Sequence, residues 1–180
     1  AVATDGSYVY KGGDRAIGGV EKVGVYRYNF NGSDADWTDR STNLTPLYDR
    51  YDSDEYAVDL PSGIALHDGE MFVSDPINNE IRVFDSSTGF EKTNRSISVT
   101  SPLELVVDDD AFLWVVSLRN SGSYEIRKYS RGSGNSTAGS YQNKRILSPN
   151  ASTPWRPKGL AIDNSGRLLV ADSGEFQQII

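Results

Sequence analysis

A repeated string of residues constrains this chain more than any other feature of its sequence. The string reads PSGIALHDGEMFVSD from Pro61 to Asp75 and RPKGLAIDNSGRLLVAD from Arg156 to Asp172. A degenerate copy, PLELVVDDDAFLWVV, runs from Pro102 to Val116, and AVATDGSYVY at the start of the sequence overlays IALHDGEMFV without a gap. Each copy has an apolar stretch, a turn rich in Asp and Gly, and a second apolar stretch, which is typical of a β-hairpin. The sequence therefore predicts one supersecondary unit repeated four times.

The spacing of the copies indicates the size of this unit. The starts at Pro61, Pro102 and Pro157 are separated by 41 and 55 residues, and a four-stranded propeller blade takes roughly 40 to 50. A third strand is expected after each hairpin, because strings such as IRVF and IRKY alternate apolar and polar residues; these strands are Val25–Phe30, Ile81–Phe84 and Ile126–Tyr129. The fourth strand has a weaker pattern, of which Ser96–Val99 is the best example. We predict an all-β fold, a β-propeller of four-stranded antiparallel blades, with unrelated hairpins in a sandwich as the alternative.

We expect a single domain that is divided into blades where the repeats start. Blade 1 covers residues 1–60 with an insertion at 31–60, blade 2 covers 61–101, blade 3 covers 102–156, and a partial blade 4 covers 157–180. The insertion is rich in Asp and Tyr, so a calcium site or tyrosine sulfation is one interpretation; a solvated acidic loop without EF-hand spacing is the other. Gly12, Gly13, Gly18 and Gly19 are interpreted as loop between strands, because no Lys-Ser/Thr follows them to hold a phosphate.

The strings PSGIAL, MFVSD, IRVFD and PKGLAID resemble NHL repeats. The resemblance is close in the second and fourth copies, partial in the third, and limited to the opening hairpin in the first. It implies a ring of about six blades, whereas this sequence accounts for three blades and most of a fourth. Because an open ring leaves sheet edges unpaired, we expect an incomplete ring that a further length of chain or another copy completes.

Composition excludes several classes of function. The net charge of −7 and the pI of 4.7 disfavour a nucleic-acid partner, including the RNA that some NHL proteins bind. The absence of cysteine removes disulfides, thiol catalysis and Cys-type zinc sites. The apolar stretches, such as Phe112–Val116, are far shorter than the roughly 20 residues that cross a bilayer. We therefore expect no membrane insertion.

Asn-x-Ser/Thr sequons are the strongest functional signal. They begin at Asn31, Asn43, Asn94, Asn135 and Asn150. Because Asn31, Asn94 and Asn135 each follow the third strand of a blade, they are expected on one face or on the outer rim. We expect most of the five to carry N-linked glycans, which implies a secreted or cell-surface protein.

Candidate ligand-binding residues are expected in the loops before the first strands and after the second strands, where propellers generally bind ligands. They are Asp75, Asn78, Asn79, Arg119, Asn120, Trp155, Arg156, Asp172 and Glu175. Asp75 and Asp172 occupy matching positions and are interpreted either as ligands of an axial metal ion or as caps of backbone amides. Trp155 is either a contact for a sugar or protein or a wedge between blades, whereas Trp114 lies in an apolar run and is expected in the core.

The sequence contains no catalytic motif. His67 is the only histidine, it is expected to be exposed beside the hairpin turn, and neither G-x-S-x-G nor H-E-x-x-H occurs. We predict no catalytic residue and no cofactor, with bound Ca²⁺ as the alternative. The expected function is a protein- or carbohydrate-interaction or structural module; the alternative, implied by the resemblance, is a metal-dependent hydrolase of the lactonase type.

Overall fold

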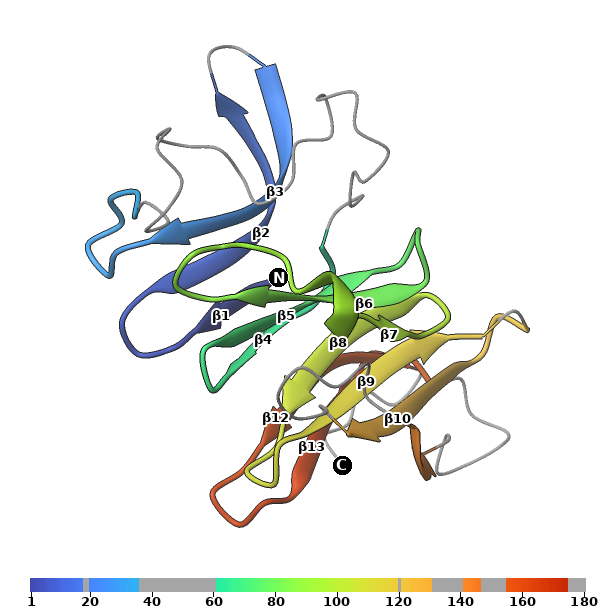
Figure 1. The fold of residues 1–180 in the computed structure, drawn as a ribbon. Coiled ribbons are helices and arrows are strands. Elements are labelled where there is room, and N and C mark those ends of the chain that lie inside the picture. The colour runs from blue at the N-terminus through green and yellow to red at the C-terminus, as the bar shows by residue number, and fades with distance from the viewer. Residues whose placement is uncertain (18–19, 36–60, 120, 131–140, 147–154, 175–180) are drawn as a thin grey trace.

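The computed structural model describes residues 1–17, 20–35, 61–119, 121–130, 141–146 and 155–174. Within these residues the chain forms antiparallel sheets that follow one another in sequence order, from blue through green and yellow to red in Figure 1. We number them sheets 1 to 4. Sheet 1 contains β1 (Val2–Thr4), β2 (Val9–Ile17) and β3 (Val20–Tyr28). Sheet 2 contains β4 (Ile64–His67), β5 (Glu70–Asp75), β6 (Glu80–Asp85) and β7 (Ile97–Ser98), with a short 3₁₀ turn, η1 (Thr93–Arg95), before β7. Sheet 3 contains β8 (Pro102–Val107), β9 (Phe112–Leu118), β10 (Tyr124–Ser130) and β11 (Tyr141–Ile146), and sheet 4 contains β12 (Pro157–Ile162) and β13 (Leu168–Asp172).

The turn between the first two strands of each sheet follows from local sequence. Asp68 and Gly69 both have positive φ, 47° and 71°, which is the two-residue type I′ turn that an Asp-Gly pair favours. The β8–β9 and β12–β13 turns are longer and place Ala111 and Gly166 in the left-handed region, at φ 62° and 73°. The expected hairpins are therefore present in all four sheets.

Hydrophobic clusters join successive sheets. Cluster 1 lies between sheets 1 and 2 and contains Tyr10, Val25, Ile64, Met71, Val73 and Phe84. Cluster 2 lies between sheets 2 and 3 and contains Ala65, Phe72, Ile81, Val83, Ile97, Val99, Leu105, Leu113, Val115 and Tyr129. Cluster 3 lies between sheets 3 and 4 and contains Trp114, Val116, Ile126, Trp155 and Val170. Because neighbouring residues of a strand point to opposite faces, each inner sheet supplies two clusters.

The first strands of the sheets lie side by side. β4 contacts both β1 and β8, and β8 contacts β12. At the contact of β4 with β8, a Cβ on Gly63 would stand 2.4 Å from Leu103 O, so only glycine fits there. This close approach explains the Gly in the Pro-x-Gly string of the second copy. The sheets thus form an arc that does not close.

The observed strands differ from the sequence interpretation in detail. The expected third strands fall within β3, β6 and β10, except that β3 ends at Tyr28, before Phe30. The interpretation of Gly12 and Gly13 as loop is wrong, because both lie inside β2. A Cβ on Gly12 would stand 2.8 Å from Pro61, so the glycine allows the two sheets to approach. Gly18, Gly19 and most of the insertion lie outside the described residues, and the exact blade boundaries stay a prediction. The part of the chain that the structure describes has no helix with the length and hydropathy of a membrane span.

Candidate functional site

In each antiparallel sheet, successive turns lie at alternate ends of the strands. The arc of sheets therefore has one set of turns at each end, and we call these two ends its faces. One face carries the β5–β6 turn, the β9–β10 turn and the residues that precede β8 and β12; we call it the candidate face. The other carries the β4–β5, β8–β9 and β12–β13 turns and the segments after β3 and β6; we call it the sequon face. Every described candidate ligand residue lies at or beside the candidate face.

Asp75 and its neighbours hold the β5–β6 turn together. Asp75 is fully buried, and its carboxylate accepts hydrogen bonds from Asn78 N at 3.1 Å and from Asn78 Nδ2 at 2.8 Å. Asn79 has a φ of 57°, and its side-chain oxygen accepts a hydrogen bond from Ser101 N at 2.8 Å. These contacts match the capping interpretation of Asp75. Ile77, at the tip of this turn, is 54% exposed.

Asp172 has the same role in sheet 4. Its Oδ1 accepts hydrogen bonds from Arg156 N at 2.8 Å and from Gly174 N at 2.9 Å. Arg156 itself is exposed at the candidate face, and so is Arg119, whose Nε lies 3.9 Å from Glu125 Oε2. The candidate face therefore presents two guanidinium groups on loops that buried carboxylates and amides hold in place.

The structure decides between the two interpretations of Trp155 and corrects that of His67. Trp155 is only 7% exposed and belongs to cluster 3 with Trp114 and Val170, so it wedges between sheets 3 and 4 instead of reaching solvent. The expected core position of Trp114 is confirmed. His67 is half-buried rather than exposed, because its ring lies beside the tight turn, with Nε2 3.4 Å from Asp68 Oδ2.

Two sequons lie among the described residues, one on the sequon face and one at the outer edge of sheet 2. Asn31 is exposed after β3, and its Oδ1 accepts hydrogen bonds from Ser33 N at 3.0 Å and from Ser33 Oγ at 2.7 Å. Asn94 is exposed within η1, which lies beside the middle of β6, between the hydrogen bond from Lys92 N to Val83 O and the pairing of Ile97 with Ile81. The other sequons and two candidate ligand residues lie outside the described residues: Asn43, Asn135, Asn150, Asn120 and Glu175.

Sequence reasoning missed a polar trio in sheet 1 that consists of Asp5, Tyr10 and Arg27. The Tyr10 hydroxyl lies 2.6 Å from Asp5 Oδ2 and 3.3 Å from Ser86 O of the neighbouring sheet. Arg27, opposite Tyr10 on β3, donates to Ser86 O at 3.2 Å and lies over the Tyr8 ring. The trio thereby holds the segment after β6 of sheet 2 against sheet 1.

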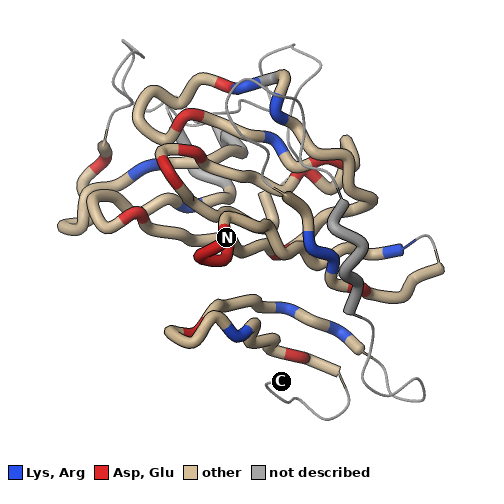
Figure 2. The backbone as a smooth tube through the Cα atoms, turned by 60° about the horizontal axis from the view of Figure 1, so that its bottom comes forward, with Lys and Arg blue, Asp and Glu red and all other residues tan. Residues whose placement is uncertain are grey.

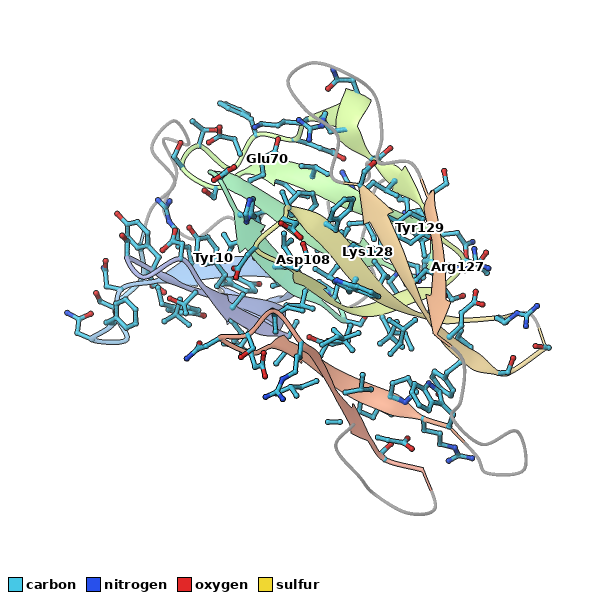
Figure 3. All side chains as sticks on the ribbon, turned by 90° about the horizontal axis from the view of Figure 1, so that it is seen from below. Tyr10, Glu70, Asp108, Arg127, Lys128 and Tyr129 are labelled. Carbon is cyan, nitrogen blue, oxygen red and sulfur yellow. The ribbon has the colours of Figure 1, made fainter. Side chains whose placement is uncertain are left out.

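Sheet 3 contains a similar trio in Asp108, Trp114 and Lys128. Figure 3 labels Asp108 and Lys128. Asp108 Oδ2 accepts from Trp114 Nε1 at 2.9 Å and lies 3.0 Å from Lys128 Nζ. Asp108 Oδ1 accepts from Phe112 N at 2.8 Å, and the Lys128 ammonium lies 4.0 Å from the centre of the Phe112 ring. A sequence signal existed: in both sheets an Asp in the first turn precedes an aromatic residue by five or six positions, and a basic residue follows on the third strand.

Hydrogen bonding shifts the pKa values of these groups. Burial disfavours the ionised form of Asp108, but hydrogen bonds from Phe112 N, Trp114 and Lys128 outweigh it and hold the pKa of this carboxyl below its ordinary value. The pKa of Asp5 is lowered in the same way, where the Tyr10 hydroxyl and the amides of Tyr8 and Ser7 outweigh burial. Burial, together with the hydrogen bond to Asp5, raises the pKa of Tyr10. Both carboxylates are therefore ionised at neutral pH and serve as acceptors.

Other charged groups are paired within sheet 2. Glu70 accepts from Arg95 at 2.9 Å and from Lys92 at 3.2 Å, and the Arg82 guanidinium binds Glu91. Acidic and basic positions are interspersed over the sheets in Figure 2. Within the described ranges no three His, Cys, Asp or Glu side chains are grouped as metal ligands would be. The charged groups of the described residues thus form hydrogen bonds and ion pairs that hold loops in place.

Comparison with known proteins defines the class of fold. No protein-family model matches the chain, and no curated protein sequence matches it. Among solved structures, a chain of the mitotic checkpoint complex matches with a TM-score of 0.59 and 13% identity over 97% of this chain and 45% of its own length. The WD40 β-propeller domain of Doa1 matches with a TM-score of 0.55 and 10% identity over 99% of this chain and 47% of that domain. Glutaminyl cyclase of Myxococcus xanthus matches with a TM-score of 0.51 and 12% identity over 99% of this chain and 68% of its own.

These likenesses, at identities of 13% or less, concern the fold alone. The chain is an all-β protein of the β-propeller type, and its described sheets form an incomplete propeller. It spans less than half the length of the first two structures.

Proposed function

We propose that the chain is part of a secreted or cell-surface glycoprotein, an NHL-like propeller that binds a protein or carbohydrate ligand through its candidate face. The observation that carries this proposal is the separation of two kinds of surface. The described sequons are exposed on the sequon face, at Asn31, and on the outer edge of sheet 2, at Asn94. Arg119, Arg156 and Ile77 are exposed at the candidate face. Glycans on the sequon face and on the outer edge leave the candidate face free for a ligand.

The loops of the candidate face suit binding more than catalysis. Asp75 and Asp172, the acidic residues expected there, are engaged by amide groups of their own turns. Loops that are fixed in advance lose little conformational entropy when a ligand binds. Arginine is among the residues that contribute most to protein interfaces.

The Pro-x-Gly string supports an NHL-like repeat. Gly63 stands where β4 meets the backbone of β8, so the glycine has a physical reason at the place where sheets approach the axis. In the degenerate copy Glu104 occupies this position. An NHL-like repeat predicts that further blades have the same glycine at the same contact.

Glycosylation is tested on protein from its native source. Peptide mapping before and after treatment with a peptide N-glycosidase should show glycan mass at Asn31 and Asn94, with conversion of each Asn to Asp on release. An intact mass equal to that of the bare polypeptide would refute the secreted-glycoprotein part of the proposal.

Ligand binding is tested with two defined probes, a printed array of oligosaccharides and a panel of purified cell-surface ectodomains. The double variant Arg119→Ala/Arg156→Ala should lose at least tenfold in affinity for any probe that binds the wild-type chain. Arg167→Ala is the matched control, because it removes an exposed guanidinium from the β12–β13 turn on the sequon face. Equal losses in both variants, or binding that neither changes, would contradict a role for the candidate face.

A metal-dependent hydrolase of the lactonase type is the second candidate, and Glu104 favours it. This residue lies on the first strand of sheet 3 and is half-buried, and burial raises its pKa, as suits a general acid. A hydrolase of this kind should bind Ca²⁺ or Zn²⁺ stoichiometrically, so chelator should lower its Tm by several degrees. The interaction module that we favour should melt at the same temperature with and without chelator.

A further inference from the structure

The two described sequons differ in how the fold holds their residues. All three residues of the sequon at Asn31 are exposed. In the sequon at Asn94 only the asparagine is exposed, because Arg95 is 5% exposed and Ser96 is half-buried. An enzyme that modifies asparagine therefore meets two different surfaces at these sites.

The sequon at Asn31 lies in a turn whose hydrogen bonds join its own residues. The Asn31 side-chain oxygen accepts from Ser33 N at 3.0 Å and from Ser33 Oγ at 2.7 Å, and Ser33 Oγ accepts from Asn29 Nδ2 at 3.0 Å. In the backbone, Gly32 N donates to Asn29 O at 2.9 Å and Asn29 N donates to Ser33 O at 2.8 Å. None of these residues is buried. The turn can therefore rearrange around an enzyme without disturbing the hydrophobic clusters.

The sequon at Asn94 is fixed to the sheet through its middle residue. The guanidinium of Arg95 donates to both carboxylate oxygens of Glu70, at 2.9 Å from Nη1 and 3.2 Å from Nη2. Glu70 is 5% exposed, so this ion pair is buried where η1 meets the start of β5. Removing one member of a buried ion pair is strongly unfavourable, because the other charge stays in the interior without its partner. Arg95 therefore resists being drawn out of sheet 2.

The backbone around η1 is also fixed to β6 on both sides. Lys92 N donates to a carbonyl of β6 at 2.8 Å before the turn, and Ile97 pairs with Ile81 after it. Ile97 is 1% exposed and belongs to cluster 2. Ser96 lies between the buried Arg95 and the buried Ile97, so its hydroxyl moves away from the sheet only if both neighbours move.

Transfer of an N-linked glycan requires more than an exposed asparagine. The amide nitrogen bonds to C1 of the oligosaccharide, the bond from C1 to the pyrophosphate of the lipid carrier breaks, and the amide loses one proton. Only Ser or Thr is accepted two positions after the Asn. The transferase therefore contacts both side chains, and the segment between them has to enter its active site. At Asn94 this would separate Arg95 from Glu70 and displace Ile97 from cluster 2.

We infer that Asn94 receives its glycan only while η1 and β7 have not yet formed on sheet 2, whereas Asn31 accepts a glycan before and after folding. Asn94 is exposed in the folded chain, so a glycan attached earlier extends into solvent. The folding of sheet 2 thus limits the time in which Asn94 is a substrate. The inference rests on the glycoprotein part of the proposed function and adds the order of modification and folding to it.

Timed addition of a purified oligosaccharyltransferase with its lipid-linked oligosaccharide tests the inference on the 180-residue chain. When the transferase is present during cell-free synthesis, peptide mapping should find glycan at both Asn31 and Asn94. When it is added to the folded, unmodified chain, occupancy at Asn94 should be at least about tenfold below that at Asn31, because opening of a packed segment is rare. Circular dichroism verifies that the second sample is folded.

Glu70→Gln tests the assigned cause within the folded chain. The variant weakens the hold on Arg95, so η1 should open more often and occupancy at Asn94 after folding should increase about tenfold. Occupancy at Asn31 should stay the same, which makes this site an internal control. If Glu70→Gln does not keep the β structure of the wild type, the timed addition to the wild-type chain decides alone.

Glu125→Gln is the matched control. Glu125 is also a buried carboxylate, 2% exposed, and it pairs with Arg127 at 2.6 Å in sheet 3, away from η1. This variant should leave Asn94 of the folded chain without glycan. Equal gains in the two variants would overturn the inference, as would equal occupancy of Asn31 and Asn94 in the folded wild type, or no glycan at Asn94 during synthesis. A native protein without glycans would refute the glycoprotein part of the proposed function and leave this difference in acceptance in place.

Discussion

Sheets 2 and 3 place different chemistry at the same position of the repeat. Phe72 of sheet 2 lies opposite Val83 in cluster 2, whereas Trp114 of sheet 3 lies opposite Lys128 and donates to Asp108. Tyr10 of sheet 1 resembles Trp114, with Asp5 and Arg27 in place of Asp108 and Lys128. A buried indole N–H or phenol O–H requires a partner, and a phenyl ring does not. Sheets 1 to 3 therefore share a large ring at this position, and polar partners occur only where the ring has a polar end.

We expect the largest loss of stability from a substitution of Phe72, the apolar ring among the three. Phe72→Ala should lower the free energy of unfolding by about 3–5 kcal/mol, because it removes a fully buried ring from cluster 2 and leaves a cavity. Denaturant titration followed by circular dichroism measures the change. A loss below about 1 kcal/mol would mean that the ring is not in a packed core.

Loss of the acceptor in sheet 3 should cost less. Asp108→Ala leaves Trp114 Nε1 and Lys128 Nζ without their carboxylate, and we expect a loss of about 2–3 kcal/mol. Asp109→Ala removes the same charge from an exposed neighbour and should change stability by less than about 0.5 kcal/mol. In the Trp114→Phe background the effect of Asp108→Ala should shrink, since one of the groups that need the carboxylate is gone. If Asp108→Ala lowered the unfolding free energy equally in both backgrounds, Asp108 would not stabilise the fold through Trp114.

The contribution of Asp108 should also depend on pH. Its pKa in the folded chain is below the ordinary value, so the unfolded chain binds the proton more readily and ionised Asp108 stabilises the fold. This stabilisation is complete above the unfolded pKa of about 3.9 and decreases as the pH falls through the folded pKa. The difference in unfolding free energy between the wild type and Asp108→Asn should therefore be constant near neutrality and shrink in acid. A difference that grows as the pH falls would contradict the assigned direction.

Tyr10→Phe should have the smallest effect of the series. The substitution gives sheet 1 a phenylalanine, the residue type that Phe72 supplies in sheet 2. It removes only the hydroxyl that lies between Asp5 and Ser86. The expected loss is about 1 kcal/mol. Because the ring remains in cluster 1, a loss as large as that of Phe72→Ala would show that the hydroxyl has a larger role than the one assigned here.

The sequence predicted the sheets better than the contacts between them. Strand periodicity and the Asp-Gly turns identified the hairpins and the third strands, because both signals are local. The interpretation of Gly12 as loop is wrong because this glycine makes room for Pro61, which lies far along the chain. Local sequence has no information on such an approach.

The same distinction between local signals and contacts of distant segments applies to the candidate site. The capping of turns by Asp75 and Asp172 depends on residues within the turn or on the paired strand, and one of the two sequence interpretations described it. The burial of Trp155 depends on where sheet 3 lies beside sheet 4, which the sequence left open. The trio of Asp108, Trp114 and Lys128 was missed because it joins three strands whose register only the structure gives.

The central claim is that successive sheets pack face to face in sequence order around an axis. The single methionine, Met71, gives one resolvable methyl resonance and belongs to cluster 1. In a nuclear Overhauser spectrum this methyl group should show cross-peaks to Tyr10 or Val25 of sheet 1. Cross-peaks to Leu113 or Val115 of sheet 3 in their place would reverse the faces of sheet 2 and contradict the account.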